Sequence, residues 1–142
     1  MEIRKGRHVV HLLHVHLVFV TKRRGKVFTK EHLGYIRYVF EKICSDFGAD
    51  VKEFNGEADH VHLLVTYPPK VRISELVNSL KGVSSRQLKQ RFPDIRQFWS
   101  VSKSRGVVWS PSYSAASCGG APISVLKQYI EQQGLGAATS PG

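Results

Sequence analysis

The segment at residues 60–67 has the sequence HVHLLVTY and is followed by Pro68-Pro69. In a β-strand, successive side chains point to opposite faces, and this segment has one continuous apolar face. The prolines end the strand because they donate no hydrogen bond to a sheet. Since an apolar strand face has to be buried, the chain must form a sheet that is covered on at least one side. One face carries Val61, Leu63, Val65 and Tyr67, and the other carries His60, His62, Leu64 and Thr66.

Other segments have the period of a strand or of a helix, and together they predict a fold class. The order is β-α-β-β-α-β-α, which is that of an α+β protein with a ferredoxin-like or RRM-like antiparallel sheet, helices on one face and an extra C-terminal helix. We expect one domain over residues 1–134 and a flexible tail over residues 135–142. The predicted elements are a strand at 9–19, a basic turn at 21–26, a helix from the cap Thr29 to Gly48, strands at 51–57 and 60–67, a helix from the cap Ser74 to Pro93, a long connection at 94–112, a strand at 113–117 and a helix from Ser124.

Positive charge is concentrated in two blocks of the chain. Residues 1–30 hold eight basic and one acidic residue, and residues 70–106 hold nine basic and two acidic residues, whereas residues 31–69 hold three basic and seven acidic ones. Two basic blocks around an acidic one favour a directional basic surface, for which nucleic acid is the natural partner. A basic soluble protein without such a partner remains open from composition alone.

The same sequence argues against a membrane or secreted protein. No apolar stretch approaches the roughly 20 residues that cross a bilayer, and the N-terminus has no small-residue cleavage site. Cys44 and Cys118 are too few for a disulfide framework or a zinc cluster. We therefore expect reduced thiols in a cytoplasmic protein.

His60 and His62 form a candidate metal site. They are two residues apart on a strand, so their Cα atoms lie roughly 6.6 Å apart and both side chains point to one face. A divalent ion between them can act as a Lewis acid on a phosphoryl oxygen. The acidic stretch before them ends in Asp59, which can orient a ligand histidine. His14 and His16 have the same spacing, but we expect that pair to be structural or DNA-facing, with His16 possible in the same groove.

A tyrosine and a glutamine share one face of the last predicted helix. Tyr129 and Gln133 are four residues apart in KQYIEQQ. A phenol can attack phosphorus when a metal polarises the scissile phosphate, and an amide oxygen suits Mg²⁺ or Mn²⁺. A packing role is the alternative for a helical tyrosine.

DHVHLLV at 59–65 and KQYIEQQ at 127–133 resemble the single-tyrosine transposases of small bacterial insertion sequences, within the His-hydrophobic-His nucleases. The resemblance extends over roughly residues 8–134. It implies that His60, His62 and Gln133 bind Mg²⁺ or Mn²⁺ and that Tyr129 attacks single-stranded DNA to form a 5′-phosphotyrosine. It also implies a homodimer whose active sites are shared between subunits, and recognition of DNA hairpins at the element ends.

The candidate DNA-binding surface is basic and contains two hydroxyl groups that can donate to phosphates. Trp99 and Trp109 are candidates for stacking on an unpaired base. Tyr113 is the rival nucleophile. The candidate surface residues are Lys22, Arg23, Arg24, Lys81, Ser84, Ser85, Arg86, Lys89 and Arg91.

Two other functions compete with transposition. A ferredoxin-like module that binds single-stranded nucleic acid without chemistry would explain the charge and the aromatic residues, but not the histidine pair beside Tyr129 and Gln133. A metal-dependent hydrolase would use water as its nucleophile, but barrels with His-x-His typically need about 250 residues. A covalent DNA adduct distinguishes transposition from both.

Overall fold

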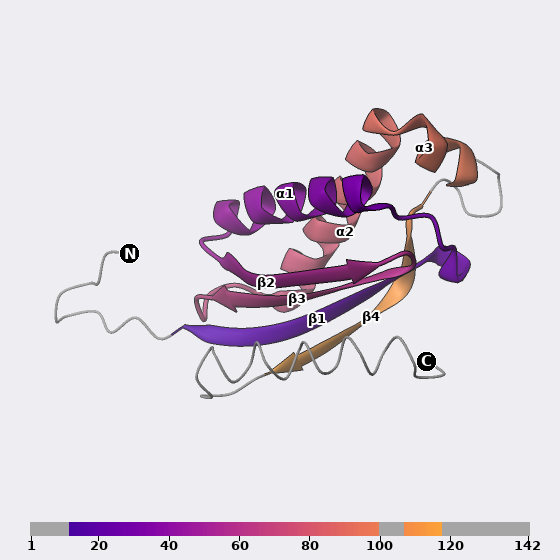
Figure 1. The fold of residues 1–142 in the computed structure, drawn as a ribbon. Helices are drawn as coiled ribbons and strands as arrows, with labels where there is room; N and C mark the ends of the chain where they lie inside the picture. Colours follow the sequence, from indigo (N-terminus) through magenta and orange to yellow (C-terminus); the bar gives the residue numbers. More distant parts are fainter. Residues whose placement is uncertain (1–11, 100–106, 118–142) are drawn as a thin grey trace, which may run out of the picture.

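A computed structural model describes residues 12–99 and 107–117 of the chain and has four strands and three α-helices there. The strands form one antiparallel sheet in the order β2-β3-β1-β4, and α1 and α2 cover one face of it (Figure 1). This is the predicted ferredoxin-like arrangement, while the predicted helix from Ser124 lies outside the described residues. The elements are β1 Leu13–Thr21, a short 3₁₀ turn η1 Lys22–Arg24, α1 Lys30–Asp46, β2 Asp50–Glu57, β3 His60–Tyr67, α2 Ile73–Arg91, α3 Pro93–Trp99 and β4 Trp109–Ser117.

Both predicted ends of α1 are confirmed. The hydroxyl of Thr29 accepts from the backbone N–H of His32, and the ring of His32 accepts from the backbone N–H of Thr29, so this histidine takes the place of the usual acidic residue in a capping box. At the other end, Gly48 has a φ of 74° and Ala49 N donates to Cys44 O at 2.8 Å. This is a Schellman ending, which favours glycine at the left-handed position.

The predictions for α2 and the segment after it need two corrections. Ser74 does not cap α2: Leu76 N donates to Arg72 O at 3.1 Å, which places the cap at Arg72 and puts Ser74 inside the first turn. Residues 94–112 are not one long connection either. Pro93 begins the short helix α3, where its missing N–H costs nothing, and β4 begins at Trp109 instead of Tyr113.

The register gives each strand one face toward the helices and one away from them. Phe19 pairs with Val61 and Tyr113, and all three lie on the helix side. Val18 pairs with His62 on the opposite side. The helix side forms the core, which Leu17, Phe19, Ile36, Phe40, Leu63, Leu80, Leu88 and Trp109 fill with at most 1% of each residue exposed. Among the described residues, no helix is long and apolar enough to cross a membrane.

Candidate active site

The histidine pair lies at the start of β3, directly after the turn that joins β2 to β3. Residues 58–59 form the two-residue turn, and His60 and His62 follow on the sheet face that points away from α1 and α2. Their ring centroids are 5.0 Å apart and the rings are nearly perpendicular. Both residues are buried, at 6% and 3% exposure.

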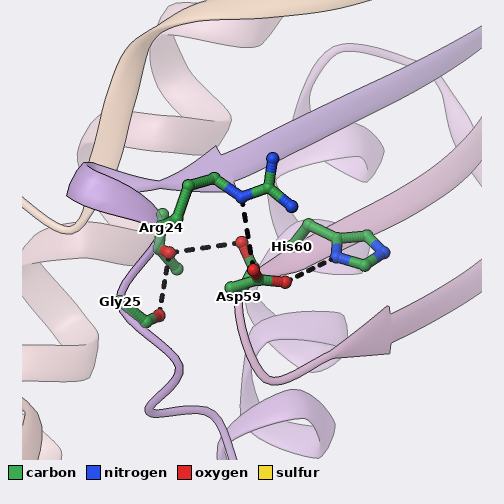
Figure 2. A network of polar contacts seen from close by, with 5 residues as sticks. Arg24, Gly25, Asp59 and His60 are labelled. Atoms are coloured by element: carbon green, nitrogen blue, oxygen red, sulfur yellow. Dashed lines mark hydrogen bonds and ion pairs between the residues drawn. The ribbon is translucent and has the colours of Figure 1, made fainter. Parts of the chain in front are cut away.

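Asp59 holds His60 from the turn. Its Oδ1 accepts from Nδ1 of His60 at 2.8 Å, and its Oδ2 accepts from Nε of Arg24 at 3.2 Å (Figure 2). Thr21 holds the backbone of the same turn, because its N–H donates to the carbonyl of Asp59 at 2.9 Å. Asp59 therefore contacts His60, as expected of an acidic residue beside the candidate ligand, and Arg24 holds the other oxygen of the same carboxylate.

His62 has a histidine as its own partner. Nε2 of His16 lies 3.4 Å from Nδ1 of His62, and the two ring planes are 11° from parallel. His16 therefore contacts the histidine pair on the same sheet face. The ring of His14 contacts Thr66 Oγ1 at 3.1 Å, further along the strand.

The remaining nitrogens of the pair fit a metal ion. Nε2 of His60 and Nε2 of His62 are buried without a hydrogen-bond partner among the described residues. Buried polar atoms are seldom left unpaired, and an imidazole nitrogen with a free lone pair is a common metal ligand. Within 12–99 and 107–117, no group of three His, Cys, Asp or Glu side chains is placed to hold a metal, and a metal on this pair would take other ligands. Gln133, the predicted third ligand, lies outside the described residues, as does Tyr129.

Burial and neighbouring charges shift the pKa values of His62 and Asp59. Burial is the main cause that lowers the pKa of His62 to about 4, with smaller contributions from His60 and His16. Burial alone would raise the pKa of the Asp59 carboxyl, but the hydrogen bonds from His60 and Arg24 outweigh it and lower that pKa. At neutral pH His62 is therefore neutral and Asp59 is charged, which is the state that favours metal binding.

Tyr113 lies on the other side of the sheet from the histidines. It pairs with Phe19, and their rings meet edge to face with centroids 6.3 Å apart. The ammonium of Lys81 lies 5.5 Å from the centroid of the Tyr113 ring. The sheet itself separates Tyr113 from His60 and His62, which argues against this rival nucleophile in the same subunit.

A second feature is a basic pocket of about 820 Å³ between α2, α3 and the start of β4. It brings together four predicted basic residues with apolar atoms of Val107, Trp109 and Pro111. Ammonium and guanidinium groups gathered in one pocket can contact the phosphates of a nucleic acid. The basic residues that line the pocket are Lys22, Lys81, Arg86, Lys89 and Arg96.

Other predicted DNA contacts are used inside the fold. The Ser84 hydroxyl accepts from Nε1 of Trp109 at 2.9 Å, and the Ser85 hydroxyl accepts from Val108 N at 3.1 Å. Both serines are buried, and of the two only Ser85 also lines the pocket. Trp109 is 1% exposed and cannot stack on a base. The guanidinium of Arg91 lies 5.1 Å from the ring centroid of Tyr35, away from the pocket lining.

Sequence reasoning missed Arg96 and did not assign His16 to His62. Arg96 belongs to α3, whose signal was present: a proline followed by Asp94 is typical of a helix start. The contact of His16 with His62 depends on the pairing of β1 with β3, which no local pattern specifies.

Comparison with known proteins finds transposases of insertion sequences among the relatives of this chain. The ISDra2 transposase TnpA of Deinococcus radiodurans is 30% identical over 134 residues, which are 94% of this chain and 92% of that protein. The transposase for insertion sequence element IS200 of Salmonella typhimurium is 33% identical over 90 residues, 59% of each protein.

Solved structures agree with the fold. A crystal structure assigned as a transposase of Deinococcus radiodurans has a TM-score of 0.70 at 31% identity and covers 92% of this chain and 97% of its own. A REP-associated tyrosine transposase bound to a REP hairpin has a TM-score of 0.56 at 14% identity, covering 93% and 68%, and supports the fold alone. The sequence profile described as "Transposase IS200 like" matches residues 9–133, so the chain belongs to the IS200-like transposase family.

Proposed function

We propose that this transposase cleaves and rejoins single-stranded DNA at the ends of an insertion sequence, with Tyr129 as the nucleophile. The observation that carries the proposal is the pair of unpartnered nitrogens, Nε2 of His60 and Nε2 of His62, buried side by side on one sheet face. Two buried imidazole nitrogens without partners have no explanation in a binding module without chemistry, whereas a metal-assisted nuclease would use them as ligand atoms.

The proposed reaction is a transesterification. The phenol oxygen of Tyr129 forms a bond to phosphorus, the bond from phosphorus to the 3′ oxygen breaks, and the proton of the phenol ends on the released 3′-hydroxyl. Attack by another 3′-hydroxyl on the 5′-phosphotyrosine reverses the exchange and rejoins the strand. One phosphodiester replaces another at each step, so no external energy source is needed.

The proposed metal is Mg²⁺ or Mn²⁺, held by His60, His62 and Gln133. When bound, it would polarise the scissile phosphate and stabilise the charge that develops on it. The chain's own part in the site is visible around the pair: Asp59 and Arg24 hold His60, and burial keeps His62 neutral.

The proposed DNA partner is a hairpin at each element end, with the basic pocket as part of its binding surface. Lys22, Lys81, Arg86 and Lys89 line that pocket, and Arg23 is exposed on the neighbouring turn. The hairpin in the REP-associated neighbour is a precedent for such a ligand on this fold. Phosphate contacts of this kind supply most of the affinity and make it depend on salt.

The test is a cleavage assay with end-labelled single-stranded DNA from the element ends, in Mg²⁺ or Mn²⁺, analysed on a denaturing gel. We expect a metal-dependent covalent adduct that is lost in Tyr129→Phe and retained in the matched control Tyr113→Phe. His60→Ala should bind DNA but form no adduct. Binding without an adduct in either metal would favour the non-catalytic module, and cleavage without an adduct would favour a hydrolase.

The proposed homodimer with shared sites has its own test. His60→Ala and Tyr129→Phe are each expected to be inactive, and a mixed dimer of the two has one site with both residues intact only if the tyrosine acts in trans. Mixing the variants should therefore restore adduct formation on the His60→Ala subunit, which carries the intact tyrosine. No recovery in a mixture shown to contain heterodimers would mean that each subunit uses its own tyrosine.

A further inference from the structure

His16 on β1 and His62 on β3 meet through their ring nitrogens. His62 pairs with Val18, so His16 is its diagonal neighbour on the same sheet face. The ring centroids are 5.5 Å apart, whereas Nε2 of His16 and Nδ1 of His62 are only 3.4 Å apart. The ring planes are 11° from parallel, and the two nitrogens lie within hydrogen-bond reach of each other.

The two ligand histidines are thus held in the same way. Nδ1 of His60 has Asp59 as its partner and Nδ1 of His62 has His16, while both Nε2 atoms are buried without a partner among the described residues. A neutral imidazole carries one proton, and a hydrogen-bond acceptor at Nδ1 keeps the proton there. The lone pair is then at Nε2.

We propose that His16 is a positioning residue, whose Nε2 accepts the hydrogen bond from Nδ1–H of His62 and so presents the Nε2 lone pair of His62 to the divalent metal. A histidine suits this place better than a carboxylate. His16 is 7% exposed, and Asp59 already supplies one buried negative charge to the pair. A second charge would add a desolvation cost that a neutral acceptor avoids. The inference rests on the proposed metal site and adds the residue that sets the tautomer of its second ligand.

The direct test is nitrogen NMR on the metal-free full chain with ¹⁵N-labelled histidine. Long-range proton–nitrogen spectra distinguish a protonated Nδ1 from a protonated Nε2. We expect His60 and His62 both to carry the proton on Nδ1. A protonated Nε2 on His62 in the wild-type protein would overturn the proposal without any variant.

Two substitutions separate the hydrogen bond from the packing of the ring. His16→Phe keeps a flat ring beside His62 but removes the acceptor, while His16→Gln keeps an acceptor oxygen near the position of Nε2. We expect His16→Phe to weaken Mn²⁺ binding, measured by electron paramagnetic resonance without DNA, by about 10- to 100-fold. His16→Gln should restore most of that affinity, and the His60 signals should stay unchanged in both variants.

The other possible results distinguish a failure of the proposed hydrogen bond from a failure of the proposed function. Equal Mn²⁺ affinity in His16→Phe and wild type, or equal loss in His16→Phe and His16→Gln with the His60 signals intact, would overturn the role of His16. Wild-type Mn²⁺ binding with the expected tautomers but no DNA adduct would instead refute the proposed function and leave the positioning role standing. If His16→Phe does not fold, the wild-type tautomer decides alone.

Discussion

Asp59 and Arg24 are 35 residues apart in the sequence, yet Oδ2 of Asp59 accepts from Nε of Arg24 at 3.2 Å beside the candidate metal pair. The other carboxylate oxygen accepts from His60 at 2.8 Å. The backbone of Arg24 has a φ of 55°, a left-handed conformation that is uncommon for residues other than glycine. Strain of this type is usually kept where it serves a site, and here it places a cation against the carboxylate that holds the candidate ligand His60.

Substitution of Asp59 should weaken metal binding through His60. We expect Asp59→Ala to lower Mn²⁺ affinity by about 10- to 100-fold, and Asp59→Asn to lower it less because the amide oxygen can still accept from Nδ1. Titration of Mn²⁺ without DNA measures this effect directly. Asp46→Asn, an exposed carboxylate at the end of α1, is the matched control and should leave the affinity unchanged. Wild-type affinity in Asp59→Ala would show that the contact has no part in the site.

Substitutions of Arg24 and of its neighbour Arg23 should affect different ligands, the metal for Arg24 and DNA for Arg23. Arg24→Gln removes a half-exposed ion pair worth about 1 kcal/mol or less, so Mn²⁺ affinity should fall by no more than roughly fivefold. Arg23→Gln should leave Mn²⁺ affinity unchanged and weaken DNA binding. Parallel Mn²⁺ and DNA titrations of the two variants test this. The reverse assignment, with Arg23 affecting the metal, would contradict the network.

Most of the fold follows from local pattern, while the contacts around the site follow from strand pairing. The alternation in 60–67 and the caps at Thr29 and Gly48 are local signals, and the structure confirms them. Ser74 failed as a cap prediction because the turn before it already places Arg72 at the helix start. The helix propensity of a residue does not predict at which residue the preceding turn lets the helix begin.

The features of the candidate site also fall into those that local sequence predicts and those that depend on strand pairing. The spacing of His60 and His62 and the acidic residue before them were visible in the sequence, and so was the preference for a basic surface. The contact of His16 with His62 was not, because it depends on the register of β1 against β3. The burial of Ser84 was also hidden, since a serine between charged residues on a helix has the composition of an exposed face.

Ser84 should behave as a structural residue. Its hydroxyl accepts from Nε1 of Trp109 at 2.9 Å in the core, so Ser84→Ala leaves a buried N–H without a partner. We expect a loss of about 1–3 kcal/mol in the free energy of unfolding, measured with urea. Ser74→Ala, on the exposed first turn of the same helix, should change it by about 0.5 kcal/mol or less. A loss of DNA affinity without a loss of stability in Ser84→Ala would instead support a phosphate contact.

Cys44 should be unreactive while the protein is folded. Burial, with smaller contributions from Asp50 and Glu41, raises the pKa of its thiol from 9.0 to about 12. In a Cys118→Ser background we expect negligible alkylation by iodoacetamide at pH 8 and rapid alkylation in urea, followed by mass spectrometry. The unfolded thiol ionises first as pH rises, so this group should also lower stability above about pH 9. Equal alkylation rates in the folded and unfolded protein would contradict the burial of Cys44.

The three-residue turn η1 connects the two features of the proposed site, since Lys22 lines the basic pocket and Arg24 holds Asp59. If the pocket binds DNA, Arg86→Gln should weaken hairpin binding and lower the slope of log affinity against log salt by roughly 0.7–0.9, the value for one phosphate contact. Fluorescence anisotropy over a series of salt concentrations measures both quantities. Arg37→Gln is the control, because Arg37 is exposed on α1 and pairs with Glu41. An unchanged slope in Arg86→Gln would place the DNA elsewhere on the surface, and an equal change in both variants would indicate only an effect of net charge.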